Sequence, residues 1–276
     1  MGLIGVTGAT GRLGGRAARA LAAGGQPQRL VVRERTRAPD LPGADVRVAS
    51  YDDGGALRRA LDGVDVLLLV SASEAADRVA QHRTAVEAAA AAGVRRVVYT
   101  SFVGAAPGCT FTFGRDHAAT EALLAASGLE ATVLRNSLYL DVLPAFAAGG
   151  AIRGPAGRGR VGAVAVADAA EVAVAALLDE SQSGRTHDVT GPEALTLAEV
   201  AAAIERVTGE PTRYVEETLE EAYASRAGLG APRWEVDGWV SSYAAVAAGE
   251  LDVVTDVVQR LTGHPPRTLE DVLRGR

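Results

Sequence analysis

One stretch near the start of the chain constrains the fold more than any other: an apolar run followed at once by three evenly spaced glycines. Residues 3–14 read LIGVTGATGRLG, and an alanine-rich helical stretch follows over residues 16–23. A strand, a tight glycine turn and a helix in that order are typical of a dinucleotide-binding entrance. Glycine at the turn can adopt positive φ and lets a pyrophosphate approach the backbone, and the helix start offers free N–H groups to the phosphates. From this loop we expect cofactor contacts at Gly8, Thr10, Gly11, Arg12, Leu13 and Gly14.

Strand-like and helix-like segments alternate through the first half of the chain. The long helix-like stretches include residues 74–92 and 115–126, and the strand-like segments after the first are residues 29–33, 45–49, 64–70, 94–100 and 131–134. This alternation predicts an α/β fold of the Rossmann type, with a doubly wound parallel sheet. The near-continuous apolar run at 64–70 is typical of a strand buried on both faces of such a sheet.

Beyond Tyr139 the alternation of strand-like and helix-like segments becomes less regular. We expect an extended run at 161–166, a helix from Asp168 to Leu178, one more strand at Thr186–Val189, and a helix that begins at a capping box of Thr196 and Glu199. The sequence thus predicts an NAD(P)-binding Rossmann domain over residues 1–150. Residues 151–276 are expected to complete the sheet and to form a smaller, mostly helical substrate lobe.

The end of the second predicted strand bears on which dinucleotide is bound. An acidic residue there holds the ribose hydroxyls of NAD, whereas an arginine accommodates the extra phosphate of NADP. Here the strand runs into Arg33, which is the first candidate for the 2′-phosphate, with Arg12 as the second. Glu34 is the contrary signal, and we interpret it as a solvated charge that points away. The sequence therefore predicts NADP(H), preferred over NAD(H).

Polar residues follow three further predicted strands, at the edge of the sheet where open α/β folds bind ligands. Asp52 follows the third strand and is placed to accept from an adenine amino group, while Asp52 or Asp53 also suits the cap of the next helix. Small polar residues follow the fourth strand, and Thr100 and Ser101 close the fifth. The cofactor contacts expected here are Asp52, Ser71, Ala72, Ser73 and Thr100.

Composition limits the classes of partner. The 276 residues carry a net charge of −6, and no basic cluster indicates nucleic acid. No apolar run approaches the roughly 20 residues of a membrane-spanning helix, no signal-peptide pattern opens the chain, and Cys109 is the single cysteine. We therefore expect a cytoplasmic protein that acts on a small molecule, with a homodimer left open. The chain contains no lysine, so any mechanism that needs lysine from this chain is excluded.

Segments spread along the whole chain resemble a known family. They are TGATGRLG at 7–14, YTS at 99–101, FGRDHAATE at 113–121, LRN at 134–136 followed by Tyr139, and DVTGPEAL at 188–195. Together they resemble the NmrA-like branch of the atypical short-chain dehydrogenase/reductases. Within that branch, the chain is most similar to the NAD(P)H:quinone oxidoreductase type 2 and triphenylmethane-reductase-like subgroup. The resemblance implies an NAD(P)H-dependent oxidoreductase.

The resemblance also marks a departure from the superfamily. Its usual acid/base pair is Tyr-x-x-x-Lys, and the equivalent register here holds Phe113 and His117. Because Phe113 has no hydroxyl, we do not expect tyrosine-driven carbonyl reduction. A quinone-like or other conjugated acceptor needs less protein acid, since delocalisation stabilises the developing anion. The catalytic candidates are His117, at the nicotinamide ribose or the acceptor, Tyr139, through its phenol, and Ser101, through its hydroxyl.

Other interpretations stay open at this point. Some NmrA-like proteins are non-catalytic NADP(H)-sensing regulators, which the lost tyrosine would suit, and an epimerase or isomerase is a weaker alternative. His117 can instead serve only as a hydrogen-bonding helix residue, and Tyr139 as a core residue. His82 is expected at the surface of its helix, and Cys109 as an incidental thiol. No histidines or carboxylates have metal-ligand spacing, so we predict no metal.

Overall fold

The computed structural model describes residues 2–275, and a seven-stranded sheet is its largest element. The strand order is β3-β2-β1-β4-β5-β6-β9. β1 (Leu3–Thr7) pairs in parallel with β2 (Gln28–Val32) and β4 (Val64–Leu69), β2 with β3 (Ala44–Val48), and β4 with β5 (Arg96–Phe102). The remaining strands are β6 (Glu130–Asn136), β7 (Ala151–Gly154), β8 (Arg160–Val161), β9 (Thr186–Val189), β10 (Leu195–Thr196) and β11 (Arg213–Glu216). The order reverses direction at β1 and β4, which is the position where doubly wound folds bind ligands.

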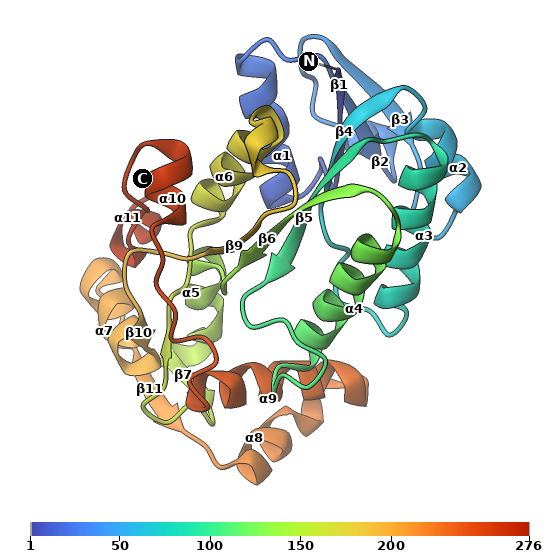
Figure 1. The fold of residues 1–276 in the computed structure, drawn as a ribbon. Helices are drawn as coiled ribbons and strands as arrows, with labels where there is room; N and C mark the ends of the chain where they lie inside the picture. Colours follow the sequence, from blue (N-terminus) through green and yellow to red (C-terminus); the bar gives the residue numbers. More distant parts are fainter. Residues whose placement is uncertain (1, 276) are drawn as a thin grey trace. The chain divides into compact units, whose positions relative to one another are not determined.

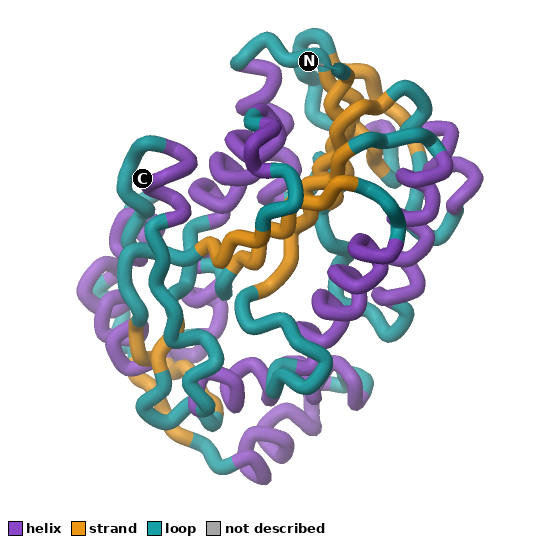
Figure 2. The backbone as a smooth tube through the Cα atoms, viewed as in Figure 1, coloured by secondary structure: helices purple, strands orange, loops and turns teal. Residues whose placement is uncertain are grey.

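Helices connect the strands and cover the sheet. Figure 1 shows α1 and α6 on one face of the sheet and α2, α3 and α4 on the other. Figure 2 shows the strands of the large sheet as one layer with helices on both sides. The helices are α1 (Arg12–Ala23), α2 (Gly54–Ala60), α3 (Arg78–Ala91), α4 (Thr112–Ala126), α5 (Leu143–Phe146), α6 (Val166–Leu178), α7 (Leu197–Thr208), α8 (Leu219–Arg226), α9 (Arg233–Ala247), α10 (Val257–Thr262) and α11 (Leu269–Leu273), with short 3₁₀ turns η1 (Arg35–Arg37), η2 (Leu140–Val142), η3 (Ala148–Gly150), η4 (Glu180–Gln182) and η5 (Ala227–Leu229). The predicted Rossmann-type sheet is confirmed.

The chain forms two compact units, each built from several segments. Unit 1 comprises the chain up to residue 101 together with 116–135 and 169–187, and it holds most of the large sheet. Unit 2 comprises 102–115, 136–168 and the chain from 188 onward, and it contains the two small sheets, β10-β8 and β11-β7. The units interleave along the sequence, and the division into domains at residue 150 stays a prediction.

The buried apolar strands of unit 1 anchor its core. In β4, Leu67, Leu68 and Leu69 are fully buried, and Tyr99 of β5 is buried beside them. Successive side chains of a strand point to opposite faces of the sheet, so burial of three in a row means that both faces are covered. Among the described residues, no helix is long and apolar enough to cross a membrane.

Helix starts are where the structure departs from the sequence expectations. α1 begins at Arg12, within the glycine loop, because Gly11 serves as its N-cap. α3 begins at Arg78, not at residue 74. α6 begins at Val166, whose amide donates to Asp141 Oδ2 at 2.8 Å, so Asp168 lies in the first turn and is not the cap. The strand at Thr186–Val189 and the capping box of α7 are confirmed.

Candidate functional site

The glycine loop between β1 and α1 has the tight geometry that its sequence predicts. Gly8 has φ of +62°, and a Cβ there would lie 3.0 Å from Val70. A Cβ on Gly14 would lie 2.4 Å from the carbonyl oxygen of Gly8, so α1 packs directly against the loop. Gly11 starts α1 with no side-chain cap. The first N–H groups of α1 are therefore not satisfied by a capping side chain and can serve an anion.

A cleft of about 310 Å³ opens at the carboxyl ends of β1, β2, β3 and β4, all within unit 1. Eight of the residues predicted to contact the cofactor line it: Gly8, Thr10, Gly11, Arg33, Asp52, Ser71, Ala72 and Ser73. The others do not line it. Leu13 and Gly14 are buried behind the loop, Arg12 is exposed at the first position of α1, and Thr100 and His117 are buried.

The charge pattern at the end of β2 agrees with a phosphate at the rim of the cleft. Arg33 is exposed and lines the cleft, and it makes no hydrogen bond or ion pair with the other residues of the described chain. Glu34 is exposed too, but it is not part of the cleft lining. Asp53 caps α2 by accepting from the amide of Ala56 at 2.9 Å, whereas Asp52 and Glu74 are carboxylates of the cleft lining.

Tyr51 is a cleft residue that sequence reasoning missed. Its hydroxyl lies 2.6 Å from Thr7 Oγ1 and donates to the carbonyl of Val70 at 2.7 Å, so it ties the ends of β1 and β4 together. Burial raises the pKa of Tyr51 well above its usual range, so the phenol stays neutral. The available signal was its position next to Asp52, directly after a strand.

His82 on α3 is buried, and the expectation that it lies at the surface is wrong. Its Nε2 accepts from the amide of Ala72 at 2.9 Å, and its Nδ1 lies 2.7 Å from Thr120 Oγ1 on α4. Burial, with the charge of Arg78 as a smaller cause, lowers the pKa of His82 to about 3. The imidazole is therefore neutral at physiological pH. The alanine-rich sequence of α3 concealed which of its faces packs inward.

His117 on α4 is also buried, and both of its ring nitrogens have partners in unit 1. Nε2 lies 3.1 Å from Arg78 Nη2, and Nδ1 lies 2.8 Å from the Tyr99 hydroxyl. A guanidinium can only donate, so Nε2 is the acceptor and Nδ1 carries the hydrogen. Burial, together with the charge of Arg78, lowers the pKa of His117 well below its usual value. Its predicted roles at the cofactor and the acceptor stay predictions.

Ser101, at the end of β5, belongs to a short polar chain. Its hydroxyl donates to Glu121 Oε1 at 2.5 Å. The same carboxylate binds Arg135 through Nε at 2.9 Å and Nη2 at 2.6 Å. Thr100 next to it accepts from the amide of Ser71 at 2.9 Å. Ser101 is thus fixed as a donor to Glu121, and its oxygen lone pairs remain available to a donor on a ligand.

Tyr139 belongs to unit 2, where Asn136 holds its hydroxyl. Asn136 Nδ2 donates to the phenol oxygen at 3.1 Å. Asn136 is buried, and its Oδ1 atom is buried without a hydrogen-bond partner. A donor aimed at the phenol oxygen stabilises negative charge there, which suits a group that gives up its proton.

Phe113 packs against two aromatic side chains and a glycine. Its ring lies over Gly238 of α9, where an added Cβ would be 2.1 Å from Phe113 Cζ. Phe111 and Trp234 pack on the same ring, with centroids 5.6 and 6.0 Å away. Phe113 is therefore a packing residue of unit 2.

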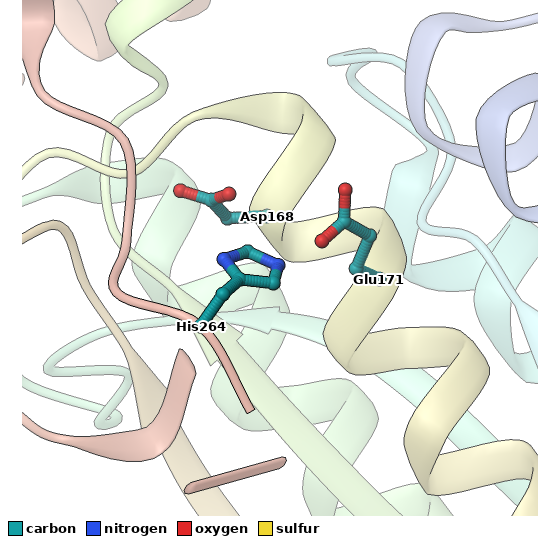
Figure 3. Close-up of side chains that lie close together, drawn as sticks. All are labelled: Asp168, Glu171 and His264. Atoms are coloured by element: carbon teal, nitrogen blue, oxygen red, sulfur yellow. The ribbon is translucent and has the colours of Figure 1, made fainter. Parts of the chain in front are cut away.

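Two acidic residues of α6 and one histidine lie close enough together to be possible ligands of a metal ion. Figure 3 shows Asp168 and Glu171 projecting from α6, with His264 drawn beside them. Asp168 accepts from the amide of Arg267 at 2.7 Å and from its guanidinium. The arginine already balances the buried carboxylate of Asp168, so a metal ion would have to displace it.

Similarity to known proteins shows the family of the chain. A model described as the NmrA-like family matches residues 1–225. The chain belongs to the NmrA-like family. The resemblance carried by its glycine loop and later segments is confirmed.

Relatives within and around this family cover the chain nearly end to end. Quinone oxidoreductase 2 from Escherichia coli is 33% identical over 277 residues, which are 98% of this chain and 96% of that protein. NAD(P)H azoreductase from Xenophilus azovorans is 33% identical over 275 residues, with 98% and 96% covered. The crystal structure of an NADPH-dependent quinone oxidoreductase from Escherichia coli, complexed with NADPH, matches with a TM-score of 0.90 at 32% identity and covers 99% of both chains.

Proposed function

We propose that this NmrA-like protein is an NADPH-dependent reductase that transfers hydride to a quinone-like or other conjugated small-molecule acceptor. The observation that carries the proposal is the cleft of unit 1, where the glycine loop, the uncapped start of α1 and the exposed Arg33 surround one opening. The relatives named as a quinone oxidoreductase and an azoreductase support this class of acceptor.

The residues around the cleft fit the phosphates and the adenine of the cofactor. The amides of the glycine loop and of α1 suit the pyrophosphate. Arg33 suits the 2′-phosphate, which NADPH carries and NADH lacks. Asp52 suits the adenine amino group, and Ser71, Ala72 and Ser73 form a further wall. Bound NADPH supplies the hydride.

A conjugated acceptor suits a chain whose acid/base register holds Phe113 and no lysine. Among the predicted catalytic residues, we propose that Tyr139 supplies the proton, because Asn136 donates to its oxygen. Ser101 would accept from the ligand, because its own hydrogen is directed to Glu121. His117 would act in its neutral form, by holding Tyr99 and Arg78, since burial and Arg78 disfavour its protonation.

We further propose a cytoplasmic setting and an acceptor of low molecular mass. Cys109 is the single cysteine, so this chain offers no pair for an intramolecular disulfide. A net charge of −6 disfavours nucleic acid as a partner. A homodimer is compatible with these features.

The experiment is an acceptor panel followed by NADPH absorbance at 340 nm, with NADH in parallel. We expect turnover with quinones and azo dyes and none with simple ketones. Tyr139→Phe should lower kcat with little change in NADPH affinity, since only the proton source changes. Tight NADPH binding with no oxidation of the cofactor across the panel would contradict a reductase and support an NADP(H)-sensing regulator.

A further inference from the structure

Side chains bind the backbone of the cleft wall that follows β4. Residues 70–75 all line the cleft. The amide of Ser71 donates to Thr100 Oγ1 at 2.9 Å, and that of Ala72 donates to His82 Nε2 at 2.9 Å. Arg78 Nε donates to the carbonyl of Ala72 at 3.0 Å. Both polar backbone groups of Ala72 are thus bound by side chains of α3.

The hydrogen bond from Ala72 fixes the tautomer of His82. An amide can only donate, so Nε2 must be unprotonated and Nδ1 must carry the hydrogen. Nδ1 then donates to Thr120 Oγ1, whose hydroxyl donates in turn to the carbonyl of Asp116 at 2.8 Å. The hydrogen bonds run in one direction, from Ala72 through His82 and Thr120 to Asp116. Thr120 therefore selects the tautomer that accepts from the cleft wall.

Apart from these two hydrogen bonds, the imidazole of His82 is surrounded by aromatic rings. It is fully buried, and the rings of Tyr51 and Tyr99 pack against it edge-on, with centroids 6.5 and 5.9 Å away. Tyr51 itself lines the cleft and binds the carbonyl of Val70. Burial keeps the ring neutral, and the charge of Arg78 disfavours a proton on it further.

We propose that His82 is a positioning residue for the cofactor: by accepting the amide of Ala72, it fixes residues 70–75 as the wall against which NADPH binds. The inference rests on the proposed function, because that function places NADPH in this cleft. His82 acts through Ala72 and does not touch the cofactor.

The test compares three substitutions with a matched control. His82→Leu removes the acceptor, Thr120→Val removes the group that selects the tautomer, and His82→Gln keeps both a carbonyl acceptor and an amide donor. The control is His187→Leu, since His187 is also buried in unit 1 and its Nε2 lies 3.0 Å from Gln182 Oε1, away from the cleft lining. NADPH affinity is measured by fluorescence titration, and amide hydrogen exchange of residues 70–75 is measured without cofactor.

We expect His82→Leu to weaken NADPH binding roughly tenfold, the effect of one lost hydrogen bond, and to speed exchange at residues 71–73. Thr120→Val should weaken binding less, and His82→Gln should restore most of it. His187→Leu should change neither quantity. Parent affinity in both His82→Leu and Thr120→Val, or equal loss in His187→Leu, would overturn the proposal.

The exchange measurement separates this inference from the proposed function. If the parent protein binds no NADPH, the proposed function fails, and parent-like exchange in His82→Leu would then also overturn the role of His82. If His82→Leu does not fold, Thr120→Val decides, because valine has nearly the shape of threonine. Unchanged exchange and affinity in folded Thr120→Val would then overturn the inference.

Discussion

Arg33 is the residue on which the proposed preference for NADPH depends. It is exposed at the cleft, it has no partner among the residues of the described chain, and Glu34 beside it does not line the cleft. A guanidinium forms strong, charge-assisted hydrogen bonds to phosphate. NADH has no 2′-phosphate to receive them.

Arg33→Ala should therefore weaken NADPH binding by roughly 10-fold while changing NADH binding by less than about 2-fold. Arg37→Ala is the matched control, since Arg37 is exposed nearby but does not line the cleft. Fluorescence titration with both cofactors measures the four affinities. Equal losses for NADPH and NADH would mean that Arg33 has a structural role.

Gly238 is required by the packing of Phe113. A Cβ at position 238 would lie 2.1 Å from Phe113 Cζ. Gly238→Ala should therefore lower the free energy of unfolding by about 1–3 kcal/mol through overpacking, which urea unfolding measures. Phe113→Tyr should not create ketone reduction, because the register would still lack lysine. A Gly238→Ala protein as stable as the parent, or a Phe113→Tyr protein that reduces ketones, would contradict this account.

At the scale of elements, the β1–loop–α1 unit follows directly from sequence, because its glycines are required by local geometry. The start of α3 does not follow from sequence. Residues 71–77 have helix-compatible composition, but His82 and Arg78 bind Ala72 in a non-helical conformation. Such long-range side-chain contacts leave no local pattern. Eight predicted cofactor residues line the cleft, because they lie in the glycine loop or directly after strands. Tyr51 and His82 were missed, because their roles depend on long-range contacts.

Gly14→Ala tests the packing of α1 on its loop. Alanine normally stabilises a helix interior by about 1 kcal/mol relative to glycine. Here its Cβ would lie 2.4 Å from a backbone oxygen, so we expect a net loss of about 1–3 kcal/mol and weaker NADPH binding. Gly24→Ala, at the other end of α1, is the control, because its Cβ would make ordinary contacts at 3.5 Å. Thermal unfolding would contradict the account if both variants behaved alike.

At the scale of the whole molecule, His82 and His117 link stability to pH. Burial lowers the pKa of His82 to about 3, and it lowers the pKa of His117 well below the ordinary value near 6.5. Between pH 6.5 and 3 the unfolded chain therefore binds protons that the folded chain does not. The stability is fully present above pH 6.5 and is lost as the pH falls toward 3.

The free energy of unfolding should thus fall between pH 6.5 and 4, with a slope of up to about 1.4 kcal/mol per pH unit from each histidine. His82→Gln removes one of these groups, so its slope should be smaller than that of the parent. Urea titrations at several pH values measure both slopes. Identical slopes would show that His82 is not held neutral by the fold.

The central claim is that this NmrA-like protein transfers hydride from NADPH to a conjugated acceptor. Single-turnover stopped-flow absorbance at 340 nm, with protein in excess over NADPH, tests it most directly. We expect loss of the NADPH signal on mixing with a quinone, at a rate well above that without protein, and no loss with a simple ketone. Bound NADPH that keeps its absorbance with every quinone and azo dye would contradict the claim.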